Sequence, residues 1–290
     1  MMTKSSSTPR SDDDTIPTKR NVIVKAVIFD LDGTLLDTEA LSCRAVIESF
    51  ASTGLSIPPK IIASLEDGGF LLPWDLKRRI LGLRGSEWVP IVLAYAQENW
   101  GVRMNLDWKR DLRTPTNNVD DDDDRQIMIA AFWKAWEQRL NDLCTTVEPC
   151  PGAMELVEGL RALNFPMAIA TSSRMDSVTK KRLRHEKMFL SFQTIVAGDD
   201  LCVKNGKPAP DIYLEAARRL GMHPSECLVF EDAWTGAKAG KSAGCHVIAV
   251  PDSRMERQPY LNVADEIIDD MWQFSGKRWG IPLEMREMRR

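Results

Sequence analysis

The chain has 290 residues, 43% of them hydrophobic, which is enough for one large globular domain or two ordinary ones. Its formal net charge of −4 gives no general attraction to nucleic acid or anionic membranes, and no apolar run approaches the roughly 18 residues of a membrane helix. Because six cysteines lie scattered without zinc-type spacing and the N-terminus lacks a signal-peptide core, we expect free thiols in a soluble, cytoplasmic protein.

Residues 1–20 are rich in Ser, Thr, Pro and Asp and contain almost no large apolar side chain. A segment of this composition cannot bury enough apolar surface to fold, so we expect a disordered tail. Its acidic run, Asp12 to Asp14, argues against an organellar transit peptide, since such peptides are poor in acids.

A strand buried on both faces is predicted for residues 22–29, which are β-branched, aromatic or apolar apart from one lysine. The strand ends at two carboxylates, Asp30 and Asp32, followed by Gly33. Ligands bind at the C-terminal strand ends of a parallel sheet. Two carboxylates placed there suit a divalent cation, a covalent nucleophile, or both.

The next hundred residues have apolar side chains at helical spacing. Helices are predicted for residues 39–51, 58–65, 74–83, 88–100 and 127–143. In the last of these, an apolar stripe that includes Trp133 and Trp136 is interpreted as core packing. A stretch of this length without a strand is too long for a simple crossover, so we expect an inserted helical domain over residues 38–146.

An acidic insertion over residues 103–126 interrupts these helices and contains five consecutive aspartates, Asp120 to Asp124. The run could bind calcium or a polycation, or it could be a solvated loop. Because it lacks the glycine and terminal glutamate of a calcium-binding loop, we expect the loop.

From Pro151 onward, helices and short strands alternate. Strands are predicted for residues 166–170, 194–197, 227–230, 246–250 and 265–268, with helices between most of them. This alternation indicates a parallel sheet covered by helices, which residues 21–37 and 147–290 would form together. Right-handed crossovers then place all C-terminal strand ends at one edge.

Polar side chains from four segments should meet at that edge. They are Asp30 and Asp32, Thr171 and Ser172, Lys207, and Glu231 with Asp232. A Mg²⁺ ion among the carboxylates would relieve their repulsion, while a lysine and a hydroxyl are the usual partners of phosphoryl oxygens. Each residue alone could be a helix cap, a turn residue or a surface charge, but convergence on one edge favours a phosphoryl site.

Four motifs carry a resemblance to a known family. They are Asp-Leu-Asp-Gly-Thr-Leu-Leu-Asp from Asp30, the strand-end Thr171, Gly-Lys-Pro-Ala-Pro-Asp from Gly206, and Phe-Glu-Asp-Ala-x-x-Gly-x-x-Ala from Phe230. In type and order they resemble the motifs of the haloacid dehalogenase superfamily. The resemblance implies an α/β protein with a Rossmann-like parallel sheet core and an inserted, all-helical cap domain.

The resemblance also implies roles for individual residues. Asp30 would be the nucleophile that forms an aspartyl-phosphate, and Asp32 the general acid and base. Asp30, the Asp32 backbone carbonyl and Asp232, with Glu231 as a further candidate, would hold Mg²⁺. Thr171 and Lys207 would bind the phosphoryl group, and Ser172 could add a hydrogen bond to it.

Several further stretches, including residues 74–77, 184–187 and 279–282, resemble the helical-cap phosphatases of small metabolites, most of all the pseudouridine-5′-phosphatases. We therefore expect a monomeric enzyme acting on a small phosphorylated metabolite, with pseudouridine 5′-phosphate as first candidate. Glycerol-3-phosphatases and sugar-phosphate phosphatases share most of these features and stay open alternatives. Trp234 stands where a smaller residue is usual, and it could narrow the entrance or pack in the core.

Two other functions have less support from the sequence. A β-phosphoglucomutase needs a second cationic phosphate site, and Gly85 stands where the cap arginine of such a mutase would fall. A non-catalytic binding module would not need both Asp30 and Asp32. If the enzyme is a phosphatase, we expect its cap to close over the core around hinges near residues 37–39 and 146–150.

Overall fold

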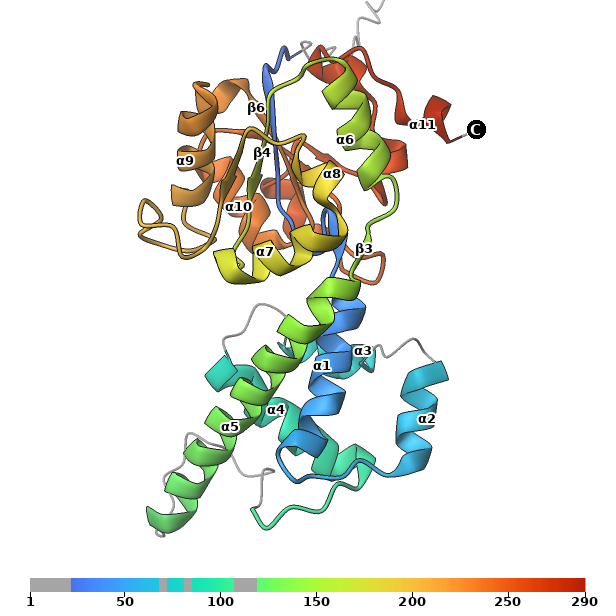
Figure 1. Ribbon diagram of the computed structural model, residues 1–290, viewed down its shortest axis with the longest axis vertical. Coiled ribbons are helices and arrows are strands. Elements are labelled where there is room, and N and C mark those ends of the chain that lie inside the picture. Colours follow the sequence, from blue (N-terminus) through green and yellow to red (C-terminus); the bar gives the residue numbers. More distant parts are fainter. Residues whose placement is uncertain (1–21, 68–71, 81–84, 107–118, 290) are drawn as a thin grey trace, which may run out of the picture.

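The computed structural model describes residues 22–67, 72–80, 85–106 and 119–289, and it has two regions that meet end to end (Figure 1). A parallel sheet with helices forms the sheet region, and helices α1 to α5 form the helical region. Within the described ranges, no helix is long and apolar enough to cross a membrane. The tail expected for residues 1–20 lies outside them.

The sheet has six parallel strands in the order β5-β4-β1-β6-β7-β8. These strands are β1 (Ala26–Phe29), β4 (Met167–Ala170), β5 (Thr194–Val196), β6 (Cys227–Glu231), β7 (His246–Ala249) and β8 (Glu266–Ile267). β1 lies in the centre, where Phe29 pairs with Ile169 on one side and Phe230 on the other. The predicted parallel α/β sheet is confirmed, and its C-terminal strand ends share one edge.

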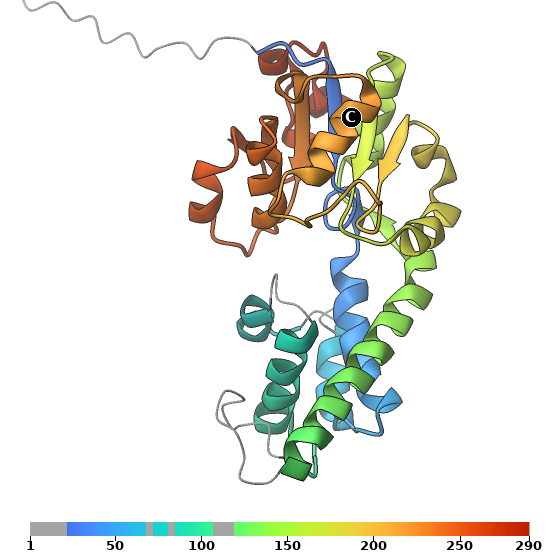
Figure 2. The same cartoon turned by 90° about the vertical axis from the view of Figure 1, so that its left-hand side faces the viewer.

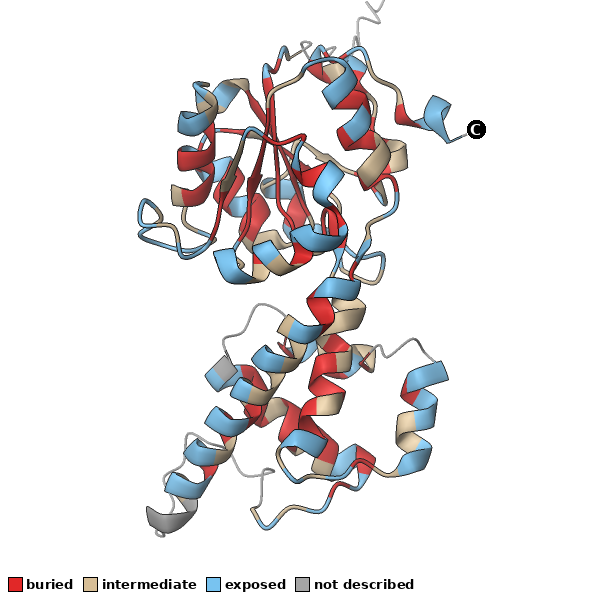
Figure 3. Ribbon diagram, viewed as in Figure 1, coloured by how far each residue is buried: buried red, intermediate tan, exposed pale blue. Residues whose placement is uncertain are grey.

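Helices cover both faces of the sheet, and the strands between them are buried (Figure 3). The covering helices are α6 (Ala153–Ala162), α7 (Met175–Arg184), α8 (Glu186–Phe189), α9 (Asp211–Leu220) and α10 (Trp234–Ser242). Ala26 and Ile28 pack with apolar residues of α9 and α10, whereas Val27 and Phe29 pack with those of α6, α7 and α8. Two apolar faces explain why β1 is apolar at every position.

Shorter elements complete the sheet region near the C-terminus. They are α11 (Met285–Met288) and the 3₁₀ turns Pro224–Glu226, Gln258–Asn262, Met271–Gln273 and Gly276–Trp279. Trp279 and Phe274 are fully buried in the core on the α6 side of the sheet. The end of the chain therefore belongs to the same packed unit as β1.

The helical region has its own apolar core. Its helices are α1 (Glu39–Ser52), α2 (Pro59–Asp67), α3 (Trp74–Ile80), α4 (Gly85–Tyr95), which continues as a π-helical turn (Ala96–Trp100), and α5 (Val119–Leu143), followed by a 3₁₀ turn (Cys144–Thr146). α1 leads away from the sheet region and α5 leads back to it, and the two helices lie side by side (Figure 2). Phe50 contacts Phe132 and Trp100 with ring centroids 5.0 and 5.8 Å apart. Phe132 therefore packs fully inside this region, whereas Trp133 and Trp136 are only partly buried against its core.

Two strands join the regions. β2 (Leu36–Asp37) precedes α1, and β3 (Glu148–Pro149) follows α5, and the two pair antiparallel. The Cys150 amide donates to the Leu35 carbonyl at 3.0 Å and extends the pairing. The two segments that link the regions, here called the first and second linkers, are thus hydrogen-bonded to each other. The first linker begins only a few residues after Asp30. The sequence did not predict this pair of strands.

The predicted start of the first strand was wrong. β1 begins at Ala26 instead of Val22, and Ile23 is 72% exposed. The amides of Val22 and Val24 donate to the carbonyls of Arg278 and Trp279, so this stretch follows the C-terminal turns before it enters the sheet.

The acidic run was also assigned wrongly. α5 begins at Val119, so Asp120 to Asp124 lie in its first turns and not in a loop. Carboxylates near a helix N-terminus interact favourably with the helix dipole, which offsets the weak helix propensity of aspartate. Residues 107–118 of the predicted insertion lie outside the described ranges.

Candidate active site

The turn after β1 brings its carboxylates towards the end of β6. Asp30 is buried and directly follows the strand, and its amide donates to the Phe230 carbonyl at 3.0 Å. Gly33 then adopts φ +86°, and a Cβ added there would lie 2.3 Å from Asp232 Oδ2. Only glycine combines this backbone conformation with so close an approach. The glycine of the first motif therefore sets the distance between the turn and Asp232.

Lys207 joins Asp30 to Glu231. Its Nζ lies 2.6 Å from Asp30 Oδ1 and 2.6 Å from Glu231 Oε1, and it donates to the Ala170 carbonyl at 3.1 Å. The Lys207 side chain is 6% exposed. Burial alone would lower the pKa of Lys207, but the two carboxylates raise it well above its usual value. The loop before α9 thus supplies a buried ammonium to the end of β1, as predicted from the sequence.

Glu231 has protein donors on both of its oxygens. Its Oε1 accepts from Lys207 and from the Tyr213 hydroxyl at 3.0 Å, and its Oε2 accepts from the Ala233 amide at 2.9 Å. A Cβ at Gly236 would lie 1.5 Å from Oε1, so the start of α10 approaches Glu231 as closely as a backbone can. These contacts suit Glu231 better to holding Lys207 than to binding a metal.

Three carboxylates lie close together with a single lysine between them. One oxygen each of Asp30, Glu231 and Asp232 lie within 4.8 Å of one another. Burial raises the pKa of Asp30 to about 7, with Glu231 and Asp32 adding to the effect and Lys207 opposing it. Burial, Glu231 and Asp30 likewise raise the pKa of Asp232 well above its usual value. The ionised forms of Asp30 and Asp232 are therefore unfavourable together with the Lys207 ammonium as their cation.

This donor set fits Mg²⁺. Hard divalent cations prefer carboxylate oxygens, and a cation beside Asp30 and Asp232 would favour their ionised forms. Asp232 is held in place by two other segments. The Thr34 hydroxyl, in the turn after β1, donates to its Oδ1 at 3.2 Å, and the Tyr260 hydroxyl, in the Gln258–Asn262 turn, donates to its backbone carbonyl at 2.7 Å.

Asp32 belongs to a second group of contacts. Its Oδ1 lies 2.5 Å from the Nζ of Lys181, a buried residue of α7. Its Oδ2 accepts from the hydroxyls of Ser173 at 2.7 Å and Thr171 at 3.3 Å. Burial acts to raise the pKa of Asp32, but the Lys181 ammonium and the hydrogen bonds outweigh it and lower the pKa below its usual value. The two aspartates of the first motif therefore have different electrostatic surroundings.

The predicted residues surround one cavity of about 380 Å³. Asp30, Asp32, Thr171, Ser172, Lys207, Glu231 and Asp232 all line it. From the helical region and its first linker come Thr38, Ser42, Trp136 and Leu140. The cavity thus opens between the sheet edge and the helical region, and every candidate residue from the sequence reaches it.

Lys181 and Ser173 were not predicted. Lys181 lies in a run of basic residues that is typical of a solvated helix. However, it shares a face with Val178 and His185, at spacings of three and four, and all three are buried. That spacing was the available signal, because a cation on the apolar face of a helix requires a buried partner.

Trp234 packs instead of narrowing the entrance. Its ring lies against the apolar core beside α9 and α10, and its Nε1 donates to the Pro259 carbonyl at 3.0 Å. Among the described residues, Ala233 and Thr235 line the cavity and Trp234 does not. The core-packing alternative for Trp234 is therefore the one that the contacts favour.

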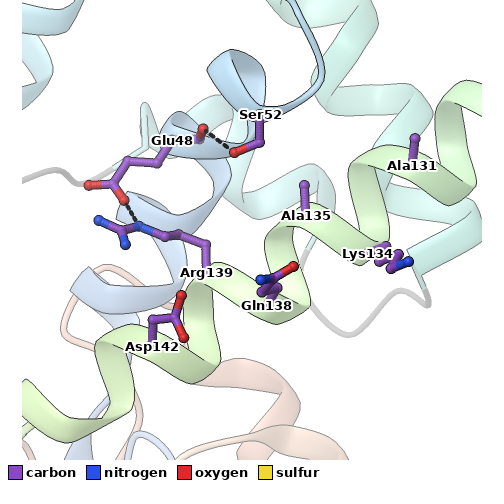
Figure 4. A pocket seen from close by; sticks show the side chains of 8 residues that line it. All are labelled: Glu48, Ser52, Ala131, Lys134, Ala135, Gln138, Arg139 and Asp142. Carbon is purple, nitrogen blue, oxygen red and sulfur yellow. Dashed lines mark hydrogen bonds and ion pairs between the residues drawn. The ribbon is translucent and has the colours of Figure 1, made fainter.

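A second hollow lies along α1 and α5 (Figure 4). Its volume is about 590 Å³, and it is lined by Glu48, Ser52, Ala131, Lys134, Ala135, Gln138, Arg139 and Asp142. Glu48 forms an ion pair with Arg139 across it. The hollow shares no lining residue with the carboxylate cavity, so we assign the chemistry to the smaller cavity at the sheet edge.

Comparisons with known proteins agree with this arrangement. A family model described as haloacid dehalogenase-like hydrolase matches residues 24–244. "(DL)-glycerol-3-phosphatase 1, mitochondrial" of Arabidopsis thaliana is 33% identical over 88% of this chain and 73% of its own length. "Probable pseudouridine-5′-phosphatase" of Drosophila melanogaster is 32% identical over 88% and 93%. A solved HAD hydrolase of family IA from Entamoeba histolytica shares the fold, with a TM-score of 0.61, 23% identity and coverage of 88% and 97%.

Proposed function

The chain belongs to the haloacid dehalogenase-like hydrolases, and we propose that within this family it is a Mg²⁺-dependent phosphomonoesterase that works through an aspartyl-phosphate. The observation that carries the proposal is the group of side chains at the sheet edge, where Lys207 lies 2.6 Å from Asp30 and an oxygen of Asp232 lies within 4.8 Å of one of Asp30. A binding module would not need a second aspartate, Asp32, with its own cation on the wall of the same cavity.

In the first step, a carboxylate oxygen of Asp30 attacks phosphorus while the bond from phosphorus to the ester oxygen breaks. Because the pKa of Asp32 is lowered in the protein alone, Asp32 must take up a proton as the substrate phosphate brings negative charge beside it. Asp32 then donates this proton to the departing oxygen, and Lys207 and the Thr171 hydroxyl stabilise the non-bridging oxygens. Bound between Asp30 and Asp232, Mg²⁺ would neutralise charge on the phosphoryl group.

In the second step, Asp32 accepts a proton from a water molecule that attacks the aspartyl-phosphate. The bond between phosphorus and the Asp30 oxygen breaks, inorganic phosphate leaves, and Asp30 returns as a carboxylate. One carboxylate therefore serves as acid and then as base, which requires it to face the leaving oxygen and the water in turn. The helical region would exclude bulk water from the cavity during both steps.

For the substrate, we propose pseudouridine 5′-phosphate. Trp136 and Leu140 contribute an apolar part of the cavity lining, which suits a flat base, and Ser42 and Ser177 add polar groups to the lining. Glycerol 3-phosphate is the second candidate, because a relative named for that activity has a similar identity. Its small, polar alcohol would leave the apolar lining at Trp136 without a partner.

A mutase would need a second phosphate site on the helical region. Lys77, one candidate on α3, already pairs with Glu39 at 2.8 Å. Among the described residues, the cations that line the cavity are Lys181 and Lys207, and both belong to the sheet region. We therefore favour hydrolysis over rearrangement.

A phosphate-release screen tests the proposal. Pseudouridine 5′-phosphate is compared with its N-linked isomer uridine 5′-phosphate, with glycerol 3-phosphate and with sugar monophosphates, each with Mg²⁺ and with a chelator. We expect pseudouridine 5′-phosphate to give the highest kcat/KM, and the chelator to abolish turnover. A higher kcat/KM for glycerol 3-phosphate would show that pseudouridine 5′-phosphate is not the preferred substrate.

Asp30→Asn should lower turnover by about 10³-fold or more, because the nucleophile is lost. Asp142→Asn is the matched control, since Asp142 is an exposed carboxylate of α5 that does not line the cavity. Wild-type turnover in Asp30→Asn would refute the proposed mechanism, whatever the substrate.

A further inference from the structure

Lys181 is a buried cation to which the proposed mechanism gives no role. Its side chain is 3% exposed, and its Nζ contacts Asp32 Oδ1 at 2.5 Å and Ser173 Oγ at 3.0 Å. Ser173 in turn donates to Asp32 Oδ2 at 2.7 Å. Each oxygen of the Asp32 carboxylate therefore has its own donor from the β4–α7 segment, and the three side chains form a closed ring of contacts.

The cost of burying an ammonium indicates that this ring has a function. Taking a lysine out of water is unfavourable by several kcal/mol unless a carboxylate compensates it. The neighbours of Lys181 on α7, Lys180 and Arg182, lie half-buried and exposed, where a charge costs little. An apolar residue at position 181 would suit the inward face of α7 beside Val178, so packing alone does not explain the lysine.

α7 is anchored at both ends, so it presents Lys181 from a fixed position. At its start, the Met175 amide donates to Asp199 Oδ1 at 2.9 Å. Beyond its end, the His185 Nε2 lies 2.7 Å from the Val147 carbonyl, in the second linker to the helical region. Lys181 thus extends from a braced helix towards Asp32.

The two lysines of the cavity also pair with different carboxylates. Lys207 pairs with Asp30 and Glu231, whereas Lys181 pairs with Asp32. Among the described residues that line the cavity, the one other cation is Lys207, which already pairs with the nucleophile. A carboxylate drawn towards that cation would turn away from the position of the leaving oxygen.

We propose that Lys181 and Ser173 are positioning residues, which hold the Asp32 carboxylate in one orientation on the cavity wall for proton transfer. The inference rests on the proposed phosphatase function. Lys181 forms no bond in the reaction: Asp32 passes its proton to the ester oxygen as the bond to phosphorus breaks, and the bonding electrons remain on that oxygen. Proton transfer in a transition state accelerates a reaction about 10²–10⁴-fold, and this gain depends on the placement of the group that donates the proton.

The kinetic test compares two leaving groups in the whole chain. An alkyl phosphate needs a proton on its leaving oxygen, whereas the p-nitrophenolate of p-nitrophenyl phosphate leaves without one. Because kcat/KM reports only the steps up to loss of the leaving group, we expect Lys181→Met to lower kcat/KM about 10²-fold for the wild type's best alkyl phosphate and under about 5-fold for p-nitrophenyl phosphate. Lys181→Arg should restore part of the loss, and Ser173→Ala should give a smaller selective loss.

Arg182→Met is the control, because it removes a positive charge from an exposed position of the same helix. It should leave both kcat/KM values within about 2-fold of wild type. An equal loss on both substrates in Lys181→Met would overturn the inference and assign Lys181 to phosphate binding or to stability. Unchanged values on both substrates would overturn it as well.

A crystal structure of Lys181→Met gives a second readout that needs no turnover. We expect the Asp32 carboxylate to leave its present orientation while Asp30, Lys207 and Glu231 keep theirs. An unmoved Asp32 would overturn the positioning role. Failure of the proposed function is recognised separately, since the wild type would then release phosphate from neither class of ester.

Discussion

Glycines at two single positions let the acidic groups of the cavity approach the backbone. Gly33 and Gly236 lie where an added Cβ would come within 2.3 Å of Asp232 and 1.5 Å of Glu231. Real Cβ atoms do not approach neighbours so closely, so any larger residue would displace the carboxylate that it faces. The position of the Glu231–Asp232 pair therefore depends on residues that carry no chemistry of their own.

Gly33→Ala should weaken the metal site. The new methyl group pushes Asp232 away, so we expect the Mg²⁺ concentration for half-maximal activity to rise about 10-fold or more, measured by Mg²⁺ titration of phosphate release. Gly54→Ala is the matched control, because Gly54 has a similar φ of +76° but no atom within 4 Å of the added Cβ. Both variants should lose about 1–2 kcal/mol of stability from backbone strain, and only Gly33→Ala should change the Mg²⁺ dependence. Equal Mg²⁺ dependence in the two variants would contradict the role given to Gly33.

Most of the candidate site could be predicted residue by residue from the sequence, for a physical reason. Asp30, Thr171 and Asp232 follow buried strands, and parallel strands bring their ends together without knowledge of side-chain contacts. Lys181 lies within a helix, where its direction depends on which face packs inward. Its partner Asp32 is 149 residues away in the sequence, so no local pattern reveals the pair.

Single elements add stability through their own charge pattern, as α9 illustrates. Glu215 is buried on this helix, and Arg218 and Arg219 donate to it at 2.7 and 2.6 Å. Hydrogen bonds from Arg218 lower the pKa of Glu215 to about 2. Burial acts to raise this pKa, and a hydrogen bond from Arg219 lowers it further. Because this pKa lies below that of the unfolded chain, the stabilisation is complete above about pH 4.5 and is lost as the pH falls towards 2.

Glu215→Gln should therefore destabilise the protein in a pH-dependent way. We expect a loss of about 1 kcal/mol at pH 7, reduced by solvent screening at the exposed Arg218, and a shrinking difference from wild type below pH 4.5. Urea denaturation at several pH values measures it. The control, Glu158→Gln, removes an exposed pair with Arg161 at the same spacing of three and should stay near wild type. A difference that stays constant down to pH 3 would rule out this explanation.

Secondary structure was predicted correctly where the apolar pattern is strong. The prediction was wrong where polar contacts determine the conformation. The parallel strands and the helices of both regions agree with the predictions within a few residues. The start of α5 was missed, because a run of aspartates resembles a loop when the helix dipole is not considered. The pairing of β2 with β3 was missed, since strands of two residues leave no periodic signal.

In the whole molecule, the helical region contacts the sheet region at a point away from its linkers. The Arg254 guanidinium lies 4.8 Å from the centre of the Trp74 ring, and Trp74 begins α3. Arg254 is itself held by Asp252, at 2.9 and 2.5 Å. Together with the β2–β3 pair, this contact joins the two regions at a second point. Hinge closure over the cavity stays a proposal, and the contact offers a way to test it.

Arg254→Ala should weaken the closed arrangement. A cation–π contact contributes about 0.5–2 kcal/mol, so we expect KM to rise about 2-fold to 10-fold with the stability of the fold little changed. Arg257→Ala is the control, because Arg257 pairs with Asp269 inside the sheet region. Steady-state kinetics of both variants on one substrate measure the effect. An unchanged KM in Arg254→Ala would show that this contact does not support closure.

The most direct test of the proposed chemistry is to trap the phosphoryl group on the enzyme. Wild type and Asp32→Asn are mixed with p-nitrophenyl phosphate and Mg²⁺, quenched in acid and digested with pepsin at low pH, where an acyl phosphate survives, and the peptides that contain Asp30 are examined by mass spectrometry. We expect one phosphoryl group on Asp30, accumulating in Asp32→Asn because water is no longer activated. Phosphate release with no phosphorylated Asp30 in either protein, or a phosphoryl group on another peptide, would contradict the mechanism.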